Sequence, residues 1–198
     1  MTATARLLIV GPQGSGKGTQ AARIAETFGV PAISTGDVFR ANIKDGTPLG
    51  RQVQAIIQAG DLVPDELTSA VVRERLAEED AARGFLLDGY PRNLGQVDDL
   101  DAFLGGRNEG IDAVIELSVP RAESIARLSV RAHEQGRADD TDEAISHRLD
   151  IYERETAPIL DVYRERGIVD QIDGVGTLDE ITERILMALI GRGLTPES

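Results

Sequence analysis

The sequence has no cysteine and no tryptophan, and its only histidines are His133 and His147. Without thiols the chain can form neither a disulfide bond nor a thiolate metal site. Two imidazoles are a poor basis for a zinc site, so we expect no zinc. Both histidines fall in segments with a helical pattern, and we interpret them as solvent-facing helix residues.

Long hydrophobic runs are also missing. No apolar stretch approaches the roughly 20 residues that a membrane-spanning helix needs. Residues 1–6 lead straight into a predicted strand and lack the pattern of a signal peptide. From these features we expect a chain that makes no membrane contact and works in the cytoplasm.

Positive charge is scarce in this chain. Its 21 basic residues face 34 acidic ones, which gives a net charge of −13. A broad nucleic-acid groove needs a basic face, so a nucleic-acid-binding ATPase is disfavoured. Only Lys17 and Lys44 are lysines, and the other basic residues are arginines. Any phosphate ligand must therefore be held by a few cations gathered locally.

Apolar segments alternate with helical patterns along the 198 residues, a length that suits one domain spanning residues 1–198. Strands are predicted for residues 7–10, 31–34, 84–87, 113–117 and 168–172. Helices are predicted for residues 16–28, 35–44, 48–58, 64–80, 94–104, 121–133, 141–166 and 178–190. Continuous apolar strands between helices indicate an α/β fold, with three layers (α/β/α) around a central five-stranded parallel sheet. Ligands of such sheets lie at the carboxyl ends of the strands.

A glycine-rich loop, Gly-Pro-Gln-Gly-Ser-Gly-Lys-Gly-Thr-Gln at residues 11–20, joins the first predicted strand to the first helix. Its glycines let backbone N–H groups point inward, the new helix adds its positive dipole end, and Lys17 supplies a cation. A nucleoside triphosphate is therefore the expected ligand. In a general phosphate loop Ser or Thr follows the lysine directly, whereas here Gly18 precedes Thr19. The alternative, a strand–helix turn without a ligand, is disfavoured by the glycines and the lysine together.

Asp88 directly follows the predicted strand 84–87. An acid in this position can organise Mg²⁺ through water, although it could also be an ordinary strand-end acid. Arg92 comes just past the same strand end, and its planar fork suits a phosphate. Gln96 lies one helical turn further on, and its amide offers both a donor and an acceptor to an adenine edge. Without that context Gln96 would be a surface residue.

A second candidate segment, Ser-Thr-Gly-Asp-Val-Phe-Arg at residues 34–40, begins at a strand end and opens a helix. Thr35 is either a helix cap or a contact to a base. Arg40 lies one turn into the helix and could reach a phosphate. Asp37 either joins Asp88 in the outer shell of Mg²⁺ or caps the helix, and both alternatives stay open.

Arginines form a third cluster. Arg127 and Arg131 are four residues apart, so they share one helix face and repel each other unless an anion neutralises them. Arg137 follows in a polar loop, and Arg148 lies on the next predicted helix. A solvated arginine-rich surface is the alternative, but a mobile loop that carries phosphate-binding arginines fits the pattern better.

Four motifs, Gly-x-x-Gly-x-Gly-Lys-Gly-Thr-Gln, Ser-Thr-Gly-Asp, Asp-Gly-Tyr-Pro-Arg and Arg-Ala-Asp-Asp, give the chain a strong resemblance to adenylate kinase over nearly its whole length. The family usually has Pro where Gln13 stands and Phe where Tyr90 stands. Neither departure removes a ligand group, though Gln13 can alter the stiffness of the loop. The interval between Arg131 and Arg137 leaves no room for the family's long inserted lid, so the chain resembles the short form without zinc.

The resemblance implies a role for each matching residue. Lys17, Arg92, Arg131, Arg137 and Arg148 would be catalytic, with Arg137 and Arg148 bridging the donor and acceptor phosphates. ATP would contact Gly14, Ser15, Gly16, Lys17, Gly18, Thr19, Arg127, Arg131 and Gly176. AMP would contact Thr35, Arg40, Asp61, Leu62, Val63, Gly89, Tyr90, Pro91, Arg92, Gln96, Arg137 and Arg148. Mg²⁺ would be held near Asp88, with Asp37 as a further acid. A small helical acceptor-binding subdomain over residues 34–63 and a short lid over residues 127–140 would be the moving parts.

The implied activity is reversible phosphoryl transfer from Mg-ATP to AMP, giving two ADP, by a monomer that serves adenine nucleotide homeostasis. Two other functions compete with it. Related kinases for UMP or CMP tend to have Ala in place of Thr35 and Asn in place of Gln96, so both positions favour adenine. A nucleotide-binding switch would not need the second, acceptor-side set of arginines.

Overall fold

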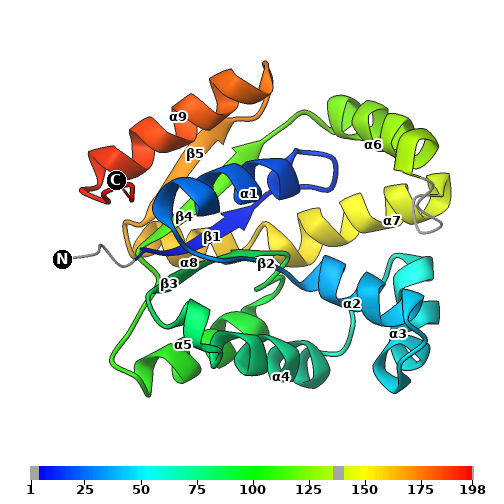
Figure 1. Cartoon of the computed structure of the whole chain (residues 1–198). Helices are drawn as coiled ribbons and strands as arrows, with labels where there is room; N and C mark the ends of the chain where they lie inside the picture. The colour runs from blue at the N-terminus through cyan, green and yellow to red at the C-terminus, as the bar shows by residue number, and fades with distance from the viewer. Residues whose placement is uncertain (1–4, 136–140, 198) are drawn as a thin grey trace.

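Five parallel strands form a single sheet in the order β2-β3-β1-β4-β5 (Figure 1). The computed structural model describes residues 5–135 and 141–197, without the side chains of residues 132–135. The strands are β1 (Ala5–Val10), β2 (Ala32–Ser34), β3 (Gly84–Asp88), β4 (Ala113–Ser118) and β5 (Val169–Asp173). This sheet confirms the prediction of a five-stranded parallel α/β fold, with each strand within a few residues of its predicted place.

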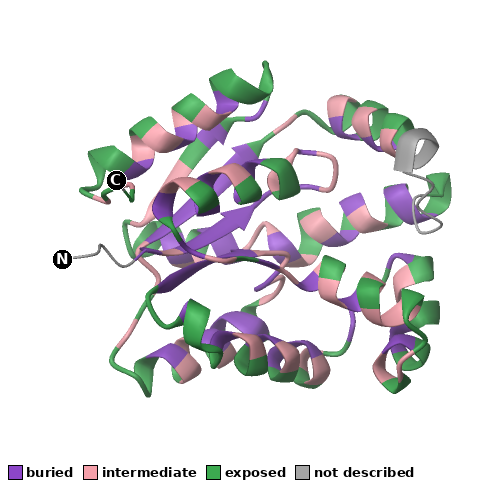
Figure 2. Cartoon of the chain, viewed as in Figure 1, coloured by how far each residue is buried: buried purple, intermediate pink, exposed green. Residues whose placement is uncertain are grey.

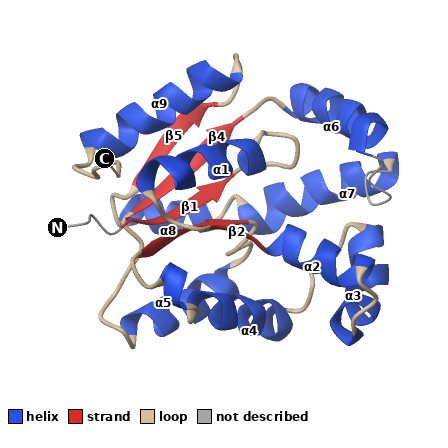
Figure 3. Cartoon of the chain, in the orientation of Figure 1, coloured by secondary structure: helices blue, strands red, loops and turns tan. Residues whose placement is uncertain are grey.

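Helices cover both faces of the sheet (Figure 3). They are α1 (Lys17–Phe28), α2 (Thr35–Lys44), α3 (Pro48–Ala59), α4 (Asp65–Leu76), α5 (Leu94–Gly105), α6 (Arg121–Gln135), α7 (Asp142–Ile151), α8 (Ile159–Glu165) and α9 (Leu178–Gly191). Within the described parts of the chain, none of these helices is long and apolar enough to cross a bilayer.

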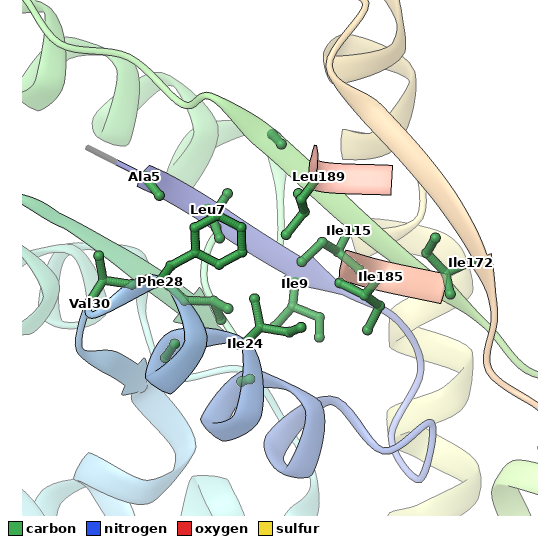
Figure 4. Close-up of a cluster of buried hydrophobic side chains, with 14 of the residues drawn as sticks. Ala5, Leu7, Ile9, Ile24, Phe28, Val30, Ile115, Ile172, Ile185 and Leu189 are labelled. Carbon is green, nitrogen blue, oxygen red and sulfur yellow. The ribbon is translucent and has the colours of Figure 1, made fainter. Parts of the chain in front are cut away.

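Side-chain alternation along the strands divides the core into two layers. Leu7 and Ile9 of β1 pack with α1 and α9 on one face, as Figure 4 shows. Leu8 and Val10 point to the other face, where α4, α5 and α8 cover them. Because both faces are covered, the central strands are buried almost throughout (Figure 2). The sheet is therefore a rigid platform for the loops at its ends.

Two smaller clusters lie beside this platform. Phe39 of α2, Val53 of α3 and Val63 form one of them, with apolar residues of α4 packed against it. Leu128 of α6 packs with Ile145 and Leu149 of α7 in the other. Each cluster has fewer buried residues than either layer of the main core.

The prediction of one helix over residues 64–80 is wrong at its end. Helix α4 stops at Leu76, and a short 3₁₀ turn follows at Glu79–Ala81. Acidic residues occupy positions 78–80, and negative charge at a helix C-terminus is unfavourable. Arg75 instead donates two hydrogen bonds to the carboxylate of Asp80, at 2.8 and 2.7 Å, which stabilises the turn.

The prediction of one continuous helix over residues 141–166 is also wrong. Helix α7 ends at Ile151, a π-helical segment occupies Tyr152–Thr156, and α8 begins at Ile159. Pro158 lies in the break. Proline has no N–H group to donate and its ring clashes with the preceding turn, so a regular α-helix cannot continue through it.

Candidate active site

The carboxyl ends of three neighbouring strands meet at one edge of the sheet. In the strand register Asp88 of β3 lies beside Ile9 of β1 on one side and beside Ser34 of β2 on the other. The loops that follow these residues therefore emerge together. They border a cavity of about 500 Å³, which is where ligands of open α/β sheets bind.

The glycine-rich loop forms one wall of this cavity. Gly14 has φ 79°, and a Cβ atom there would lie 2.5 Å from the carbonyl oxygen of Ser124, so the loop fits closely only with glycine at this position. Lys17, the first residue of α1, donates hydrogen bonds from its ammonium to the carbonyls of Gly11 (2.7 Å) and Pro12 (3.0 Å). Among the described residues no side chain caps α1, which leaves its first N–H groups for an anion.

Lys17, Asp88 and Arg92 are partly withdrawn from water in the cavity. Burial lowers the pKa of Lys17 to about 8, while Asp88 opposes the shift and Arg92 and Arg131 add to it. Burial also raises the pKa of the Asp88 carboxyl, an effect that Lys17 and Arg92 oppose. The pKa of Arg92 is lowered, again chiefly by burial. An anionic ligand would favour the charged forms of Lys17 and Arg92, so the site is matched to phosphates.

Arg92 and Thr35 are tied to the same backbone atom. Arg92 donates from Nε to the carbonyl of Gly89 at 2.8 Å, and the Thr35 hydroxyl donates to that carbonyl at 3.0 Å. The cap of α2 is Ser34, whose Oγ accepts from the Asp37 N–H at 3.3 Å. The alternatives of Thr35 or Asp37 as the cap are therefore wrong. Asp37 instead pairs with Arg40 at 2.5 Å.

Gln96 is buried beneath the cavity, with 1 % of its surface exposed, so the alternative of a surface glutamine is wrong. Its Oε1 accepts from the backbone N–H of Arg92 at 2.8 Å, and its Nε2 donates to Asp65 Oδ1 at 2.8 Å. Asp65 is an acid in the first turn of α4. Its hydrogen bond to Gln96 spans 31 residues and has no sequence signal.

The segment Asp61–Val63 lines the cavity after α3, and helix α7 supports it. The Asp61 carboxylate lies 2.6 Å from Nε2 of His147, and Arg148 donates from Nη2 to the carbonyl of Ile57 at 2.9 Å. His147 is exposed on α7, as predicted for a surface helix residue. Its contact with Asp61 was not predicted. The side chain of His133 lies outside the described residues.

At the other end of the cavity, Arg127 joins two loops. It donates from Nη1 to the carbonyl of Ser15 at 3.4 Å and from Nη2 to that of Gly174 at 3.0 Å, and its Nε pairs with Glu123 at 2.8 Å. Arg131, one turn further along α6, lines the same cavity. The alternative of a purely solvated arginine surface is therefore wrong for this pair.

Most of the predicted site residues line this one cavity: Gly14, Gly16, Lys17, Gly18, Thr19, Thr35, Asp37, Arg40, Asp61, Leu62, Val63, Asp88, Gly89, Arg92, Gln96, Arg127, Arg131 and Arg148. Ser15, Tyr90 and Gly176 are described but do not line it, and Pro91 borders a smaller cavity of about 30 Å³ beside it. Arg137 lies outside the described residues.

Three residues make further contacts in or beside the site. Gln13 lines the cavity, and its Oε1 is buried without a hydrogen-bond partner in the described parts of the chain. The Tyr90 hydroxyl lies 2.8 Å from Ser69 Oγ and donates to the carbonyl of Gln96 at 3.3 Å, bonds that a phenylalanine would lack. Thr156 donates to the carbonyl of Arg92 at 2.8 Å. No sequence pattern marked Thr156, because only the fold brings it to Arg92.

Comparison with known proteins identifies the family of this chain. The family model described as "Adenylate kinase" matches residues 9–168. An adenylate kinase of Clavibacter michiganensis is 60% identical over 98% of this chain and 96% of its own length. Adenylate kinases of Leifsonia xyli, at 59% over 96% of each chain, and Thermobifida fusca, at 50% over 94% of this chain and 99% of its own, are also similar. This chain belongs to the adenylate kinase family.

Proposed function

We propose that this chain transfers the γ-phosphoryl group of ATP to AMP, giving two ADP, within the cavity at the carboxyl edge of its sheet. Family membership supports the reaction. The observation that carries the assignment of residues is that one cavity holds both the phosphate-loop lysine, Lys17, and a separate group of arginines that includes Arg40 and Arg92. Two phosphate-bearing substrates need two such sets of cations.

ATP occupies the end of the cavity bordered by the glycine-rich loop. Residues 14–19 surround its phosphates with backbone N–H groups, and Lys17 contacts the transferring group. Arg127 lies at the adenine and Arg131 at the phosphates. Both line the cavity, and the hydrogen bond of Arg127 to the Ser15 carbonyl supports a place beside the glycine-rich loop. The hydrogen bond of Arg127 to Gly174 places the arginine beside the loop after β5, and this position supports a role for the backbone near Gly176 at the edge of the base.

AMP occupies the end bordered by α2 and the loop after β3. Arg40 and Arg92 bind its phosphate, and Thr35, Gln96 and the backbone of residues 61–63 and 89–91 bind its base and sugar. Burial supports the role of Arg92, since a guanidinium withdrawn from water interacts strongly with an anion. Arg148 and Arg137 contact both phosphates, although Arg137 lies outside the described residues.

Mg²⁺ accompanies ATP in this reaction, and the residues present fit the ion. The Asp88 carboxylate and the Thr19 hydroxyl line the cavity on the side of Lys17, and both offer the hard oxygen atoms that Mg²⁺ prefers. Asp88 holds the ion, in part through water, with Asp37 as a further acid. When bound, the ion neutralises charge on the phosphate oxygens. With no cysteine in the chain, a zinc-binding lid of the cysteine type is excluded.

Transfer needs positioning and neutralisation of charge rather than a general base, because the AMP phosphate is already an anionic nucleophile. Water competes as an acceptor, so the cavity closes before transfer. Residues 34–63 form the acceptor-binding subdomain, supported by their own apolar cluster around Phe39 and Val53. Residues 127–140 form the short lid. A single chain carries both ends of the cavity, and we therefore propose a monomer.

The test is ADP formation from Mg-ATP with AMP, CMP or UMP as acceptor. We expect strong preference for AMP, and preference for a pyrimidine would overturn the roles of Thr35 and Gln96. ATP binding without transfer to any acceptor would favour a nucleotide switch instead.

Arg92→Ala is the matching variant, and we expect it to lower turnover by orders of magnitude without unfolding. Arg83→Ala, a substitution of an exposed arginine just before β3, is the control and should leave turnover unchanged. Near-wild-type turnover of the Arg92 variant would contradict its role.

A further inference from the structure

Both ends of the Gln96 carboxamide are held by groups that differ in hydrogen-bonding character. Oε1 faces the backbone N–H of Arg92, which can only donate, at 2.8 Å. Nε2 faces Oδ1 of Asp65, and a carboxylate can only accept, at 2.8 Å. The reverse orientation would place a donor against a donor and an acceptor against an acceptor. In a side chain with 1 % of its surface exposed, both lost hydrogen bonds would go unreplaced by water.

Asp65 is itself held in place as an acceptor. Asn93 caps α5, its Oδ1 accepting from the Gln96 N–H at 2.9 Å, so its Nδ2 is turned away from that cap. That Nδ2 donates to Asp65 Oδ1 at 2.9 Å. A single carboxylate oxygen thus accepts from two side-chain amides. Asp65 itself stands in the first turn of α4, where the positive end of the helix stabilises its negative charge.

Gln96 keeps unused hydrogen-bonding capacity after these contacts. Its Nε2 has a second proton and its Oε1 a second lone pair, and the side chain lines the cavity. Adenine presents a matching edge, because its 6-amino group donates and its N1 accepts. Hypoxanthine presents the reverse edge, with an accepting oxygen at C6 and a proton on N1. It would be matched only by the carboxamide in the reverse orientation.

We propose that Asp65 is a specificity-determining positioning residue, which holds the Gln96 carboxamide in the one orientation that accepts a 6-aminopurine and rejects a 6-oxopurine. The proposal rests on the proposed role of Gln96 at the acceptor base. Asp65 touches no substrate in this scheme, since it acts through the amide that it orients. Without Asp65, only the backbone N–H of Arg92 would disfavour the reverse orientation of the Gln96 carboxamide.

The experiment measures kcat/KM for AMP and for IMP as acceptors with saturating Mg-ATP. Asp65→Ala and Asp65→Leu both remove the carboxylate that accepts from Gln96, and leucine keeps most of the volume of the aspartate side chain. Whichever of the two variants folds can be used for the measurement. We expect the AMP-to-IMP ratio to fall about two- to tenfold, the worth of one net hydrogen bond. Asp65→Asn keeps an Oδ1 that can accept from both amides, and it should hold the ratio within about twofold of the wild type.

Glu66→Ala is the matched control, because Glu66 is an exposed acid in the same first turn of α4. It removes the same charge from the helix terminus without touching Gln96, and the ratio should not change. A parallel loss of kcat/KM for AMP and IMP in the Asp65 variants, with the ratio unchanged, would mean a purely structural role and would overturn the proposal.

Gln96→Ala separates this proposal from the proposed function on which it rests. If Gln96→Ala lowers the ratio while the folded Asp65→Ala or Asp65→Leu variant does not, the orienting role fails and the base-reading role of Gln96 stands. If Gln96→Ala leaves the ratio unchanged, the base-reading role itself is wrong. In the double variant, Asp65→Ala should lower the ratio no further, since the amide it orients is gone.

Discussion

The Thr156 hydroxyl donates a hydrogen bond to the backbone carbonyl of Arg92 at 2.8 Å, across 64 residues of sequence. Thr156 is the last residue of the π-helical segment between α7 and α8, and its side chain is buried. Through this bond the irregular part of the α7–α8 region supports the loop that carries Arg92. Single π-helical turns are frequent at functional sites, and here the turn brings a hydroxyl to the backbone of Arg92, which lines the cavity.

Thr156→Val tests this support. Valine preserves the shape of the side chain but leaves the Arg92 carbonyl without its partner, which should lower the free energy of unfolding by about 1–3 kcal/mol. Because this loop carries Arg92, which we propose binds the AMP phosphate, we expect the KM for AMP to rise while the KM for ATP stays unchanged. Denaturant unfolding and initial rates measure the two effects. Thr195→Val, at an exposed threonine near the C-terminus, is the control, and equal effects of both substitutions would contradict the assignment.

The Lys17 ammonium predicts a pH dependence. Its pKa is lowered to about 8 in the unliganded chain, so the cation is lost as the pH rises through that value. Phosphates in the complex favour the charged form and raise the pKa. Since kcat/KM reports the free enzyme and kcat the complex, kcat/KM for Mg-ATP should decline above about pH 8 while kcat persists to higher pH.

Initial rates between about pH 7 and about pH 10 measure this difference. Lys17→Arg is the matched variant, because its guanidinium stays charged over the range, and its lower activity should show no such decline. A kcat/KM that stays flat in the wild-type chain through about pH 9 would contradict the role of Lys17.

Two glycines of the loop predict substitutions of different severity. Gly14 and Gly16 both have positive φ, at 79° and 91°. A Cβ on Gly14 would also lie 2.9 Å from Leu128 Cγ, whereas no described atom lies within 4 Å of a Cβ on Gly16. Gly16→Ala should cost about 1–2 kcal/mol of stability, the penalty of the backbone conformation. Gly14→Ala should cost more, because steric overlap adds to that penalty. Thermal unfolding ranks the two, and an equal loss would contradict the close packing of the loop on α6.

The fold could be predicted well from the sequence, and its errors have local causes. Each strand coincides with an apolar run between helical patterns, so the sheet could be predicted from the sequence. The end of α4 depends on Arg75 folding back to Asp80. The break after Ile151 depends on Pro158, a helix breaker just before α8. Periodicity alone continued both helices too far, because it carries no information about such termini.

The candidate site was predictable where its residues follow the carboxyl ends of neighbouring strands. Lys17, Asp88 and Arg92 each lie at a strand end or just beyond it, so their convergence followed from the parallel sheet. The supporting contacts of Asp65 and Thr156 join residues far apart in the sequence, and no local pattern encodes them. These residues are ordinary in their own segments and acquire a role only from the packing of α4, α5 and the π-helical turn.

The central claim of this account is that the two ends of the cavity hold different nucleotides. Arg40 lies on α2 and pairs with Asp37, while Arg127 lies on α6 and contacts the loops of Ser15 and Gly174. The most direct measurement is the KM of both substrates for Arg40→Ala and Arg127→Ala. We predict that Arg40→Ala raises the KM for AMP at least about tenfold and leaves the KM for ATP unchanged. Arg127→Ala should raise the KM for ATP by a similar factor and leave the KM for AMP unchanged. If both variants raise the same KM, the assignment of the two ends is contradicted.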